Sequence, residues 1–255
     1  MLRLQKVSKI FNKNTVNEKV IFDKFDFTIE EGEFVVIIGS NGSGKSTLMN
    51  LISGKTAADS GKILIDGVDV SNQLEHVRAK QVGRVFQDPL MGTASNMRIY
   101  ENLAMASRKG QKIGLKWCIS KKDIDRYRDM VKSLGLGLEN HLNTKVGLLS
   151  GGQRQALTLL MATMQKPRIL LLDEHTSALD PKTAGIVLDH TEKIIKENNL
   201  TTLMITHNMN DAIRLGTRLV MLSGGKVIFD AKGEEKKNLT PEILLRKFSE
   251  VEHCI

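Results

Sequence analysis

A glycine-rich octapeptide near residue 40 is the segment that most clearly suggests a chemical role. It consists of Gly39, Ser40, Asn41, Gly42, Ser43, Gly44, Lys45 and Ser46, with Thr47 beginning the next segment. This is the P-loop pattern G-x-x-x-x-G-K-[ST], in which glycines let successive N–H groups surround the phosphates of a nucleotide. We expect Lys45 to reach the β- and γ-phosphates, Ser46 to offer its hydroxyl to Mg²⁺, and the following helix to direct its N-terminus at the anion. The alternative is a plain glycine-rich turn.

An acidic pair ends a second apolar segment. Residues 169–172 read Ile-Leu-Leu-Leu and are followed by Asp173 and Glu174. In open α/β sheets, ligand groups lie at the carboxyl ends of strands. Asp173 could therefore hold Mg²⁺ through water, and Glu174 could polarise the water that attacks the γ-phosphate. In isolation, two solvated acids at a strand end would be the better interpretation.

A second donor-rich segment consists of Ser150, Gly151, Gly152 and Gln153. Two glycines and a serine before a helix form an anion cradle at a helix N-terminus, although a simple helix cap has the same composition. Because the P-loop already fills that role, the second cradle is spare within its own chain. It indicates a second copy of the chain or a partner.

In this order, the three segments resemble the ATPase subunits of ATP-binding-cassette (ABC) transporters. The resemblance covers nearly the whole chain and implies that Ser150 to Gln153 contact the ATP bound by the opposite subunit of a head-to-tail dimer. It also implies roles for four further residues: Phe11 stacks on adenine, Gln87 reaches Mg²⁺ and water, Asp180 belongs to the D-loop at the dimer interface, and His207 helps to position the attacking water. From the sequence alone, Phe11 fits a core position almost as well, and His207 could be a packed or capping ring. Where the family commonly has proline, this chain has His175.

The segment from Asp173 to Thr183, with residues 91–94 and 135–140, looks like one bacterial subgroup of this family. Its members generally accompany a permease and a solute-binding lipoprotein, with aromatic amino acids such as tryptophan or tyrosine as proposed cargo. The resemblance implies ATP and Mg²⁺ as cofactors, transmembrane permease subunits as partners, and a location on the cytoplasmic face of the membrane through the permease. An exporter ATPase stays open as an alternative.

A non-transport ABC ATPase acting on nucleic acid is the second class of function considered. The net charge of +8 is compatible with it, and eight of the basic residues lie between Arg108 and Arg128. For this basic cluster we favour a solvated face first, contact with anionic lipid second and a nucleic-acid patch third. The chain lacks the coiled-coil insertion or duplicated cassette usual in such proteins, so we do not expect nucleic acid as a partner.

The helices and strands expected around these residues indicate an α/β fold of the P-loop NTPase type. Residues 34–38, 169–172 and 203–206 are apolar runs typical of buried parallel strands. We expect short antiparallel strands over residues 1–33, hairpins at 63–70 and around 223–225, and helices beginning at Pro181 and Pro241. The resemblance implies a single ABC nucleotide-binding domain over 1–255 with a helical signature subdomain at about 90–165. Cys118 and Cys254 have no metal or redox spacing, which suits a reducing cytosol.

Overall fold

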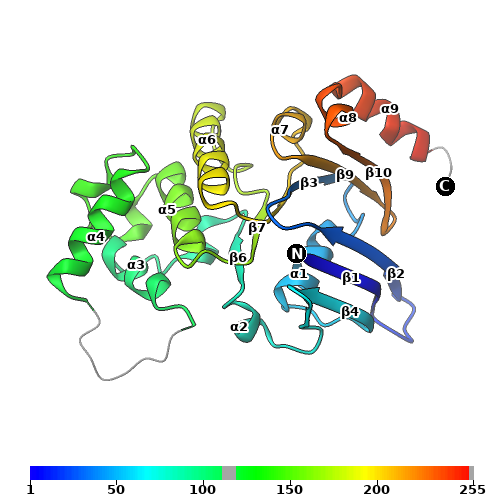
Figure 1. Cartoon of the computed structure of the whole chain (residues 1–255), viewed down its shortest axis with the longest axis horizontal. Helices are drawn as coiled ribbons and strands as arrows, with labels where there is room; N and C mark the ends of the chain where they lie inside the picture. Colours follow the sequence, from blue (N-terminus) through cyan, green and yellow to red (C-terminus); the bar gives the residue numbers. More distant parts are fainter. Residues whose placement is uncertain (111–118, 253–255) are drawn as a thin grey trace. The chain divides into compact units, whose positions relative to one another are not determined.

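The computed structural model describes residues 1–110 and 119–252. They form two compact units: unit 1 consists of Met1–Arg78 and Asn199–Ile255, and unit 2 of Ala79–Asn198. Both cysteines, Trp117 and part of the basic cluster, including Lys112 and Lys116, lie outside the described residues. Figure 1 traces the elements of both units in chain order.

The N-terminal part of unit 1 is an antiparallel sheet in the order β2-β1-β4-β5. Its strands are β1 (Leu2–Phe11), β2 (Lys19–Ile29), β4 (Ser60–Ile65) and β5 (Val68–Asp69). The expectation of short strands over 1–33 was wrong, because β1 and β2 span 10 and 11 residues. In β1 the register shifts between Leu4 and Val7, and Lys6 has a φ of 49°. This irregularity lets Leu2, Leu4 and Val7 all be buried, and it breaks the alternation that marks a long strand in sequence.

The other sheet strands of unit 1 lie in the order β10-β9-β3-β8. β3 (Phe34–Gly39) pairs in parallel with both β8 (Thr202–Ile205) and β9 (Arg218–Ser223), and β10 (Lys226–Lys232) pairs antiparallel with β9. Residues Val35 to Ile38 are at most 2% exposed. The predicted buried strands and both predicted hairpins are confirmed, although β8 ends one residue before Thr206.

The described part of unit 1 also contains five helices: α1 (Lys45–Ser53), α2 (Glu75–Arg78), α7 (Met209–Arg214), α8 (Glu234–Lys237) and α9 (Pro241–Glu252). The C-terminal ends of α1 and α7 each accept hydrogen bonds from a buried cationic side chain. The guanidinium of Arg78 donates to the carbonyls of Leu51 and Ile52 in the last turn of α1. The ammonium of Lys236 donates to the carbonyls of Ile213 and Gly216 around the end of α7. A cation suits these positions because the last carbonyls of a helix carry its negative dipole end.

Unit 2 contains two parallel strands, β6 (Val82–Val85) and β7 (Ile169–Asp173), and the long helix α6 (Pro181–Asn198). Between β6 and β7 the described chain is mostly helical, as expected. Its helices are η1 (Pro89–Gly92), α3 (Ile99–Ser107), α4 (Lys121–Lys132), η2 (Leu138–Asn140), η3 (Val146–Leu148) and α5 (Gly151–Thr163).

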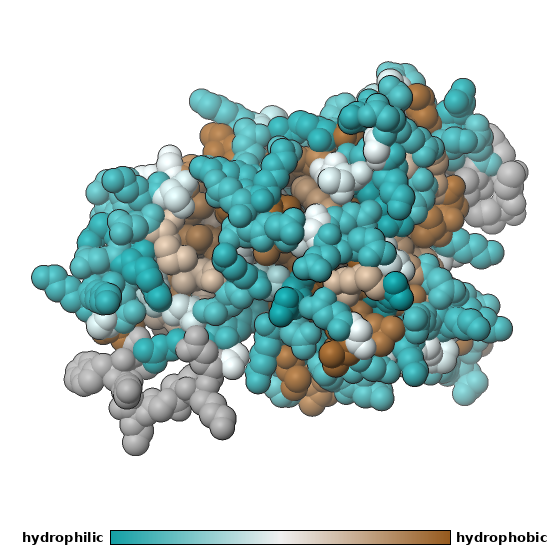
Figure 2. Space-filling model, in the orientation of Figure 1, coloured by the Kyte–Doolittle hydropathy of each residue, from teal (hydrophilic) through white to brown (hydrophobic). Residues whose placement is uncertain are grey.

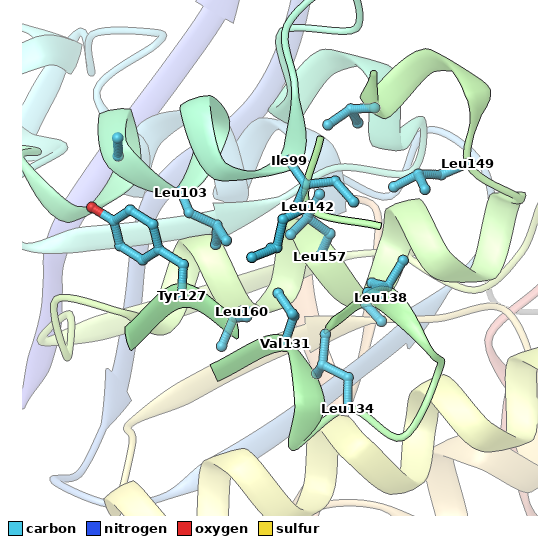
Figure 3. Close-up of a cluster of buried hydrophobic side chains, with 13 residues drawn as sticks. Ile99, Leu103, Tyr127, Val131, Leu134, Leu138, Leu142, Leu149, Leu157 and Leu160 are labelled. Carbon is cyan, nitrogen blue, oxygen red and sulfur yellow. The ribbon is translucent and has the colours of Figure 1, made fainter. Parts of the chain in front are cut away.

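A core of thirteen buried side chains holds α3, α4 and α5 together. Figure 3 shows Leu103 from α3, Tyr127 and Val131 from α4, and Leu157 and Leu160 from α5 directed into this core. The Tyr127 hydroxyl lies 2.9 Å from that of Ser107, so its polar end is satisfied. The helix that Ser150 caps, α5, is therefore packed in one cluster with α3 and α4.

Hydrophilic residues cover most of the face drawn in Figure 2, with apolar residues in scattered patches. Within the part of the chain that the structure describes, no helix is both long enough and apolar enough to cross a bilayer.

Candidate functional site

The P-loop joins β3 to α1, as predicted. Gly44 is the N-cap of α1 and has a φ of 105°. A Cβ at Gly44 would lie only 2.8 Å from Cζ of Phe22, so both the backbone angle and the packing require glycine. The Nζ atom of Lys45 donates to the carbonyls of Gly39 (2.7 Å) and Ser40 (2.9 Å), which holds the ammonium within the loop. This arrangement presents backbone N–H groups and one cation to an anion at a helix N-terminus.

His207 lies at the same cavity as the start of the P-loop. The cavity has a volume of about 430 Å³ and is lined by Ile38, Gly39, Ser40, His207, Met209, Leu245, Phe248 and Ser249. His207 is exposed and directly precedes Asn208, the N-cap of α7. Two segments predicted separately from the sequence are therefore brought together within unit 1.

Phe11 is the last residue of β1 and is 37% exposed. The ammonium of Lys9 lies 5.2 Å from its ring centroid. The alternative of a core phenylalanine is therefore wrong, and a ring with this exposure can stack on a planar ligand.

The acidic pair ends β7 in unit 2. Asp173 is the last strand residue, and Glu174 turns the chain sharply with a φ of 45°. Both the backbone N–H of Ser177 and its hydroxyl donate to the Glu174 carbonyl, at 3.0 and 2.9 Å. A left-handed conformation is strained for glutamate, and the two hydrogen bonds from Ser177 stabilise it.

The ring of His175 points into the protein. It is 1% exposed, and its Nε2 lies 3.1 Å from the hydroxyl oxygen of Thr191 on α6. Because that hydroxyl donates its proton to the Val187 carbonyl (2.8 Å), we assign the imidazole proton to Nε2. Nδ1 is then an acceptor, and it has no hydrogen-bond partner among the described residues. Burial lowers the pKa of His175 to about 4, so the ring is neutral near pH 7 and shapes the turn rather than placing a charge beside Glu174.

Gln87 lies just beyond β6 and is exposed. The preceding backbone is fixed from α5, because Nε2 of Gln155 donates to the Phe86 carbonyl at 3.3 Å. Sequence reasoning missed Gln155, since only the fold shows that it faces a strand end 69 residues away.

Ser150 is the N-cap of α5, and it forms a reciprocal capping box with Gln153. The Gln153 N–H donates to the Ser150 hydroxyl oxygen (3.3 Å), and the Ser150 N–H donates to Oε1 of Gln153 (3.2 Å). The simple helix cap considered above therefore exists. It does not use the hydroxyl proton of Ser150, which stays available for an acceptor such as a phosphate oxygen. Ser150 and Gly151 are exposed, while Gly152 is buried against Thr183 of α6.

Asp180 caps α6, as the Asp-Pro sequence predicts. Its Oδ1 accepts from the Thr183 N–H at 3.1 Å, and the hydrogen bonds from Thr183 hold the pKa of Asp180 below its usual value. The carboxylate is exposed, so the cap leaves part of it accessible.

The candidate residues thus form two groups. Unit 1 holds Phe11, the P-loop and His207, and unit 2 holds Gln87, the Ser150 segment, Asp173, Glu174 and Asp180. The structure adds one charged contact that the sequence did not reveal: Nη2 of Arg84 lies 2.8 Å from Oδ2 of Asp173.

Comparisons with known proteins agree with these observations. The sequence pattern of the ABC transporter family matches residues 22–177. A tyrosine transport ATP-binding protein of Clostridioides difficile (strain R20291) is 47% identical over 248 residues, which cover 97% of this chain and 98% of that protein. A methionine import ATP-binding protein of Clostridium tetani (strain Massachusetts / E88) is 34% identical over 261 residues, covering 100% of this chain and 76% of that protein.

Among solved structures, a dimeric ATP-binding cassette in a post-hydrolysis state, bound to ADP and phosphate, is also similar. It has a TM-score of 0.77 and 29% identity, and the match covers 91% of this chain and 98% of that one.

Proposed function

Because the chain belongs to the ABC transporter family, whose ATPase subunits hydrolyse ATP, we propose that it drives an importer of a small solute, namely an aromatic amino acid. The observation that carries the ATP-hydrolysing part of this proposal is that His207 and the first P-loop residues, Gly39 and Ser40, line one cavity. A phosphate cradle alone would suit many nucleotide-binding proteins. An imidazole beside its start supplies the group that this family uses near the γ-phosphate.

In the proposed mechanism, the P-loop amides and Lys45 bind the phosphates and compensate their charge. Glu174, whose turn is fixed by Ser177, polarises the attacking water. His207 orients that water and the γ-phosphate. Phe11 holds the adenine through its exposed ring.

Magnesium is the cation that the residues fit. Ser46, Gln87 and Asp173 offer a hydroxyl, an amide oxygen and one carboxylate, all hard oxygen donors. Among the described residues, no three His, Cys, Asp or Glu side chains gather into a metal site of their own. This donor set suits Mg²⁺, which retains waters and takes its remaining ligands from nucleotide phosphates. When bound, Mg²⁺ neutralises charge that develops on the phosphates.

Two copies of the chain form the complete enzyme in this proposal. The spare hydroxyl proton of Ser150 and the exposed backbone of Gly151 would bind the γ-phosphate of ATP held by the other copy, and Asp180 would lie at the same interface. The dimeric cassette described above supports this arrangement. Closure of the dimer on ATP would move permease subunits in the membrane, so the chain would work at the cytoplasmic face with a solute-binding lipoprotein as a further component.

The cargo proposal rests on the tyrosine transport relative, which matches almost the full length of both chains. Reconstitution with the permease and lipoprotein in vesicles, with ATP on the side of this subunit, should give ATP-dependent uptake of tyrosine, tryptophan or phenylalanine. Methionine serves as a competing cargo, since a methionine import protein is also similar. Transport of methionine but not of aromatic amino acids would contradict the cargo assignment.

The Glu174→Gln variant tests the catalytic assignment. It should retain ATP binding and reduce turnover by roughly 10²–10⁴-fold, the usual contribution of a general base. It should also accumulate as an ATP-bound dimer, measured by size-exclusion chromatography with and without ATP. Glu235→Gln changes an exposed glutamate of α8 and is the matched control. Wild-type turnover in Glu174→Gln would exclude Glu174 as the base.

A further inference from the structure

An ion pair links two neighbouring strands at the carboxylate proposed for Mg²⁺. Nη2 of Arg84 lies 2.8 Å from Oδ2 of Asp173, and the two side chains are 11% and 19% exposed. Arg84 lies on β6, which pairs in parallel with β7 and places Arg84 opposite Leu171. A contact of this length between ionised groups is a charge-assisted hydrogen bond, and its low exposure reduces screening by salt.

The guanidinium is itself held in place. Its central carbon lies 4.8 Å from the ring centroid of Phe86, which is a cation–π distance. The Phe86 carbonyl accepts the hydrogen bond from Gln155 on α5. Arg84 therefore approaches Asp173 from a fixed direction, and a lysine could not reproduce both the planar donor group and the stacking.

We propose that Arg84 is a positioning residue that fixes the Asp173 carboxylate for Mg²⁺; this rests on the role proposed for Asp173 above. Oδ2 accepts from Arg84, so Oδ1 would be left to accept from a water bound to Mg²⁺. Mg²⁺ demands near-ideal octahedral geometry, so a rotating carboxylate binds it less well. Groups that orient metal ligands typically contribute 10- to 100-fold to metal affinity.

Electrostatic repulsion alone predicts that removal of Arg84 would strengthen Mg²⁺ binding. A guanidinium near the site repels Mg²⁺, so its removal would lower the Mg²⁺ requirement. The triphosphate is the largest negative charge that Mg²⁺ meets in the site, and one guanidinium changes the total little. We therefore expect removal of Arg84 to weaken Mg²⁺ binding, because the Asp173 carboxylate loses its fixed orientation. A higher Mg²⁺ midpoint indicates loss of orientation, and a lower midpoint indicates relief of electrostatic repulsion.

The experiment measures Mg²⁺-dependent binding without turnover. In the Glu174→Gln background, binding of the fluorescent nucleotide mant-ATP is titrated with Mg²⁺ and compared with binding in EDTA. Arg84→Met should raise the Mg²⁺ concentration for half-maximal enhancement by about tenfold and leave affinity in EDTA unchanged. Arg84→Lys retains the charge and should give a smaller increase. An unchanged or lowered Mg²⁺ midpoint in Arg84→Met would overturn the inference.

Two further variants separate the causes of failure. Arg128→Met is the control. It removes an exposed ion pair of similar length, 2.9 Å to Asp125, whose side chains are 49% and 58% exposed, and it should not change the Mg²⁺ midpoint.

Asp173→Asn should raise the midpoint at least as much as Arg84→Met. If Asp173→Asn has no effect, the proposed magnesium role of Asp173 is wrong, and the inference fails with it. If Asp173→Asn raises the midpoint and Arg84→Met does not, only the role of Arg84 is excluded. Should Arg84→Met fail to fold, Arg84→Leu, whose side chain likewise has no hydrogen-bond donor, provides the same comparison.

Discussion

The imidazole of His175 and the hydroxyl of Thr191 form a buried hydrogen bond that ties the turn after Glu174 to α6. Neither side chain is more than 1% exposed. The turn therefore carries Glu174, the proposed base, while the neighbouring His175 anchors it in the packed interior of unit 2. Where the family commonly has proline after the glutamate, this chain has a neutral histidine.

We expect acid to destabilise the fold through His175. Its folded pKa is lowered to about 4 by burial, whereas the unfolded chain protonates near 6.5. As the pH falls below 6.5 the unfolded state binds the proton and the folded state does not, so stability is lost until the pH reaches about 4. Between pH 7 and pH 5 this loss amounts to about 2 kcal/mol. Urea unfolding at both pH values should show a smaller decrease for His175→Gln, and an equal decrease in both proteins would contradict the prediction.

Replacing Phe11 should weaken ATP binding according to the aromatic surface that remains. Phe11→Ala should raise the Kd for ATP on the order of tenfold, because base–aromatic stacking contributes about 1–3 kcal/mol. Phe11→Trp should bind at least as well as the wild type. Val68→Ala, which shortens another exposed apolar side chain of the same sheet, is the control. Equal affinity of Phe11→Ala and the wild type, measured by isothermal titration calorimetry, would place adenine elsewhere.

Two inactive variants should restore activity when mixed. Lys45→Ala damages the phosphate cradle of its own chain, and Gly151→Asp places a negative charge where the partner's γ-phosphate would bind. A heterodimer then has one intact site and one doubly damaged site. At equal mixing, ATPase should recover to at most about a quarter of wild type, because half of the dimers each carry one good site. No recovery despite heterodimers detected by affinity pull-down would argue against sites shared between copies.

A charge at Met91 should uncouple ATP hydrolysis from transport. Met91 is 62% exposed on η1, the first helix after Gln87. Because the family's glutamine loop links the ATP site to the helical subdomain, we expect this exposed segment to contact the permease. Met91→Glu should leave the ATPase of the isolated subunit within about twofold and reduce uptake by the assembled transporter at least about tenfold, because burying an unpaired charge is costly. Met105→Glu alters an exposed methionine of α3 as a control. Gly92, also on η1, is less suitable for introducing a charge. A Cβ at Gly92 would lie 2.6 Å from Cγ2 of Thr158, so a substitution there would also disturb packing.

The elements predicted best were those whose pattern depends on burial alone. Residues 34–38 and 169–172 are buried on both faces of their strands, so their sequences are apolar without interruption and easy to recognise. The strands of residues 1–33 were predicted too short, because the irregularity at Lys6 breaks the alternation. Asp180 and Ser150 cap helices as their sequences predict, since a cap depends on residues within one turn.

Contacts between distant segments could not be predicted. Arg84 and Asp173 are 89 residues apart, and nothing near either residue signals the pairing. Similarly, a histidine after Glu174 could face solvent or the interior, and only the position of Thr191 on α6 decides between them. The P-loop, in contrast, is local in sequence, and its glycines are required by the backbone that the loop adopts.

The pairing of β3 has a consequence for the order in which the chain can fold during synthesis. Both neighbours of β3 in unit 1, β8 and β9, are made only after all of unit 2 has been translated. At about 5–20 residues per second, the ribosome needs roughly 10–30 s to reach them after completing β3. Throughout that time an apolar strand has neither edge paired with these partners, which is the condition under which nascent chains aggregate or recruit chaperones. The strand that leads into the P-loop is therefore synthesised early but gains its sheet neighbours late. The yield of folded protein should depend on translation speed across residues 79–198.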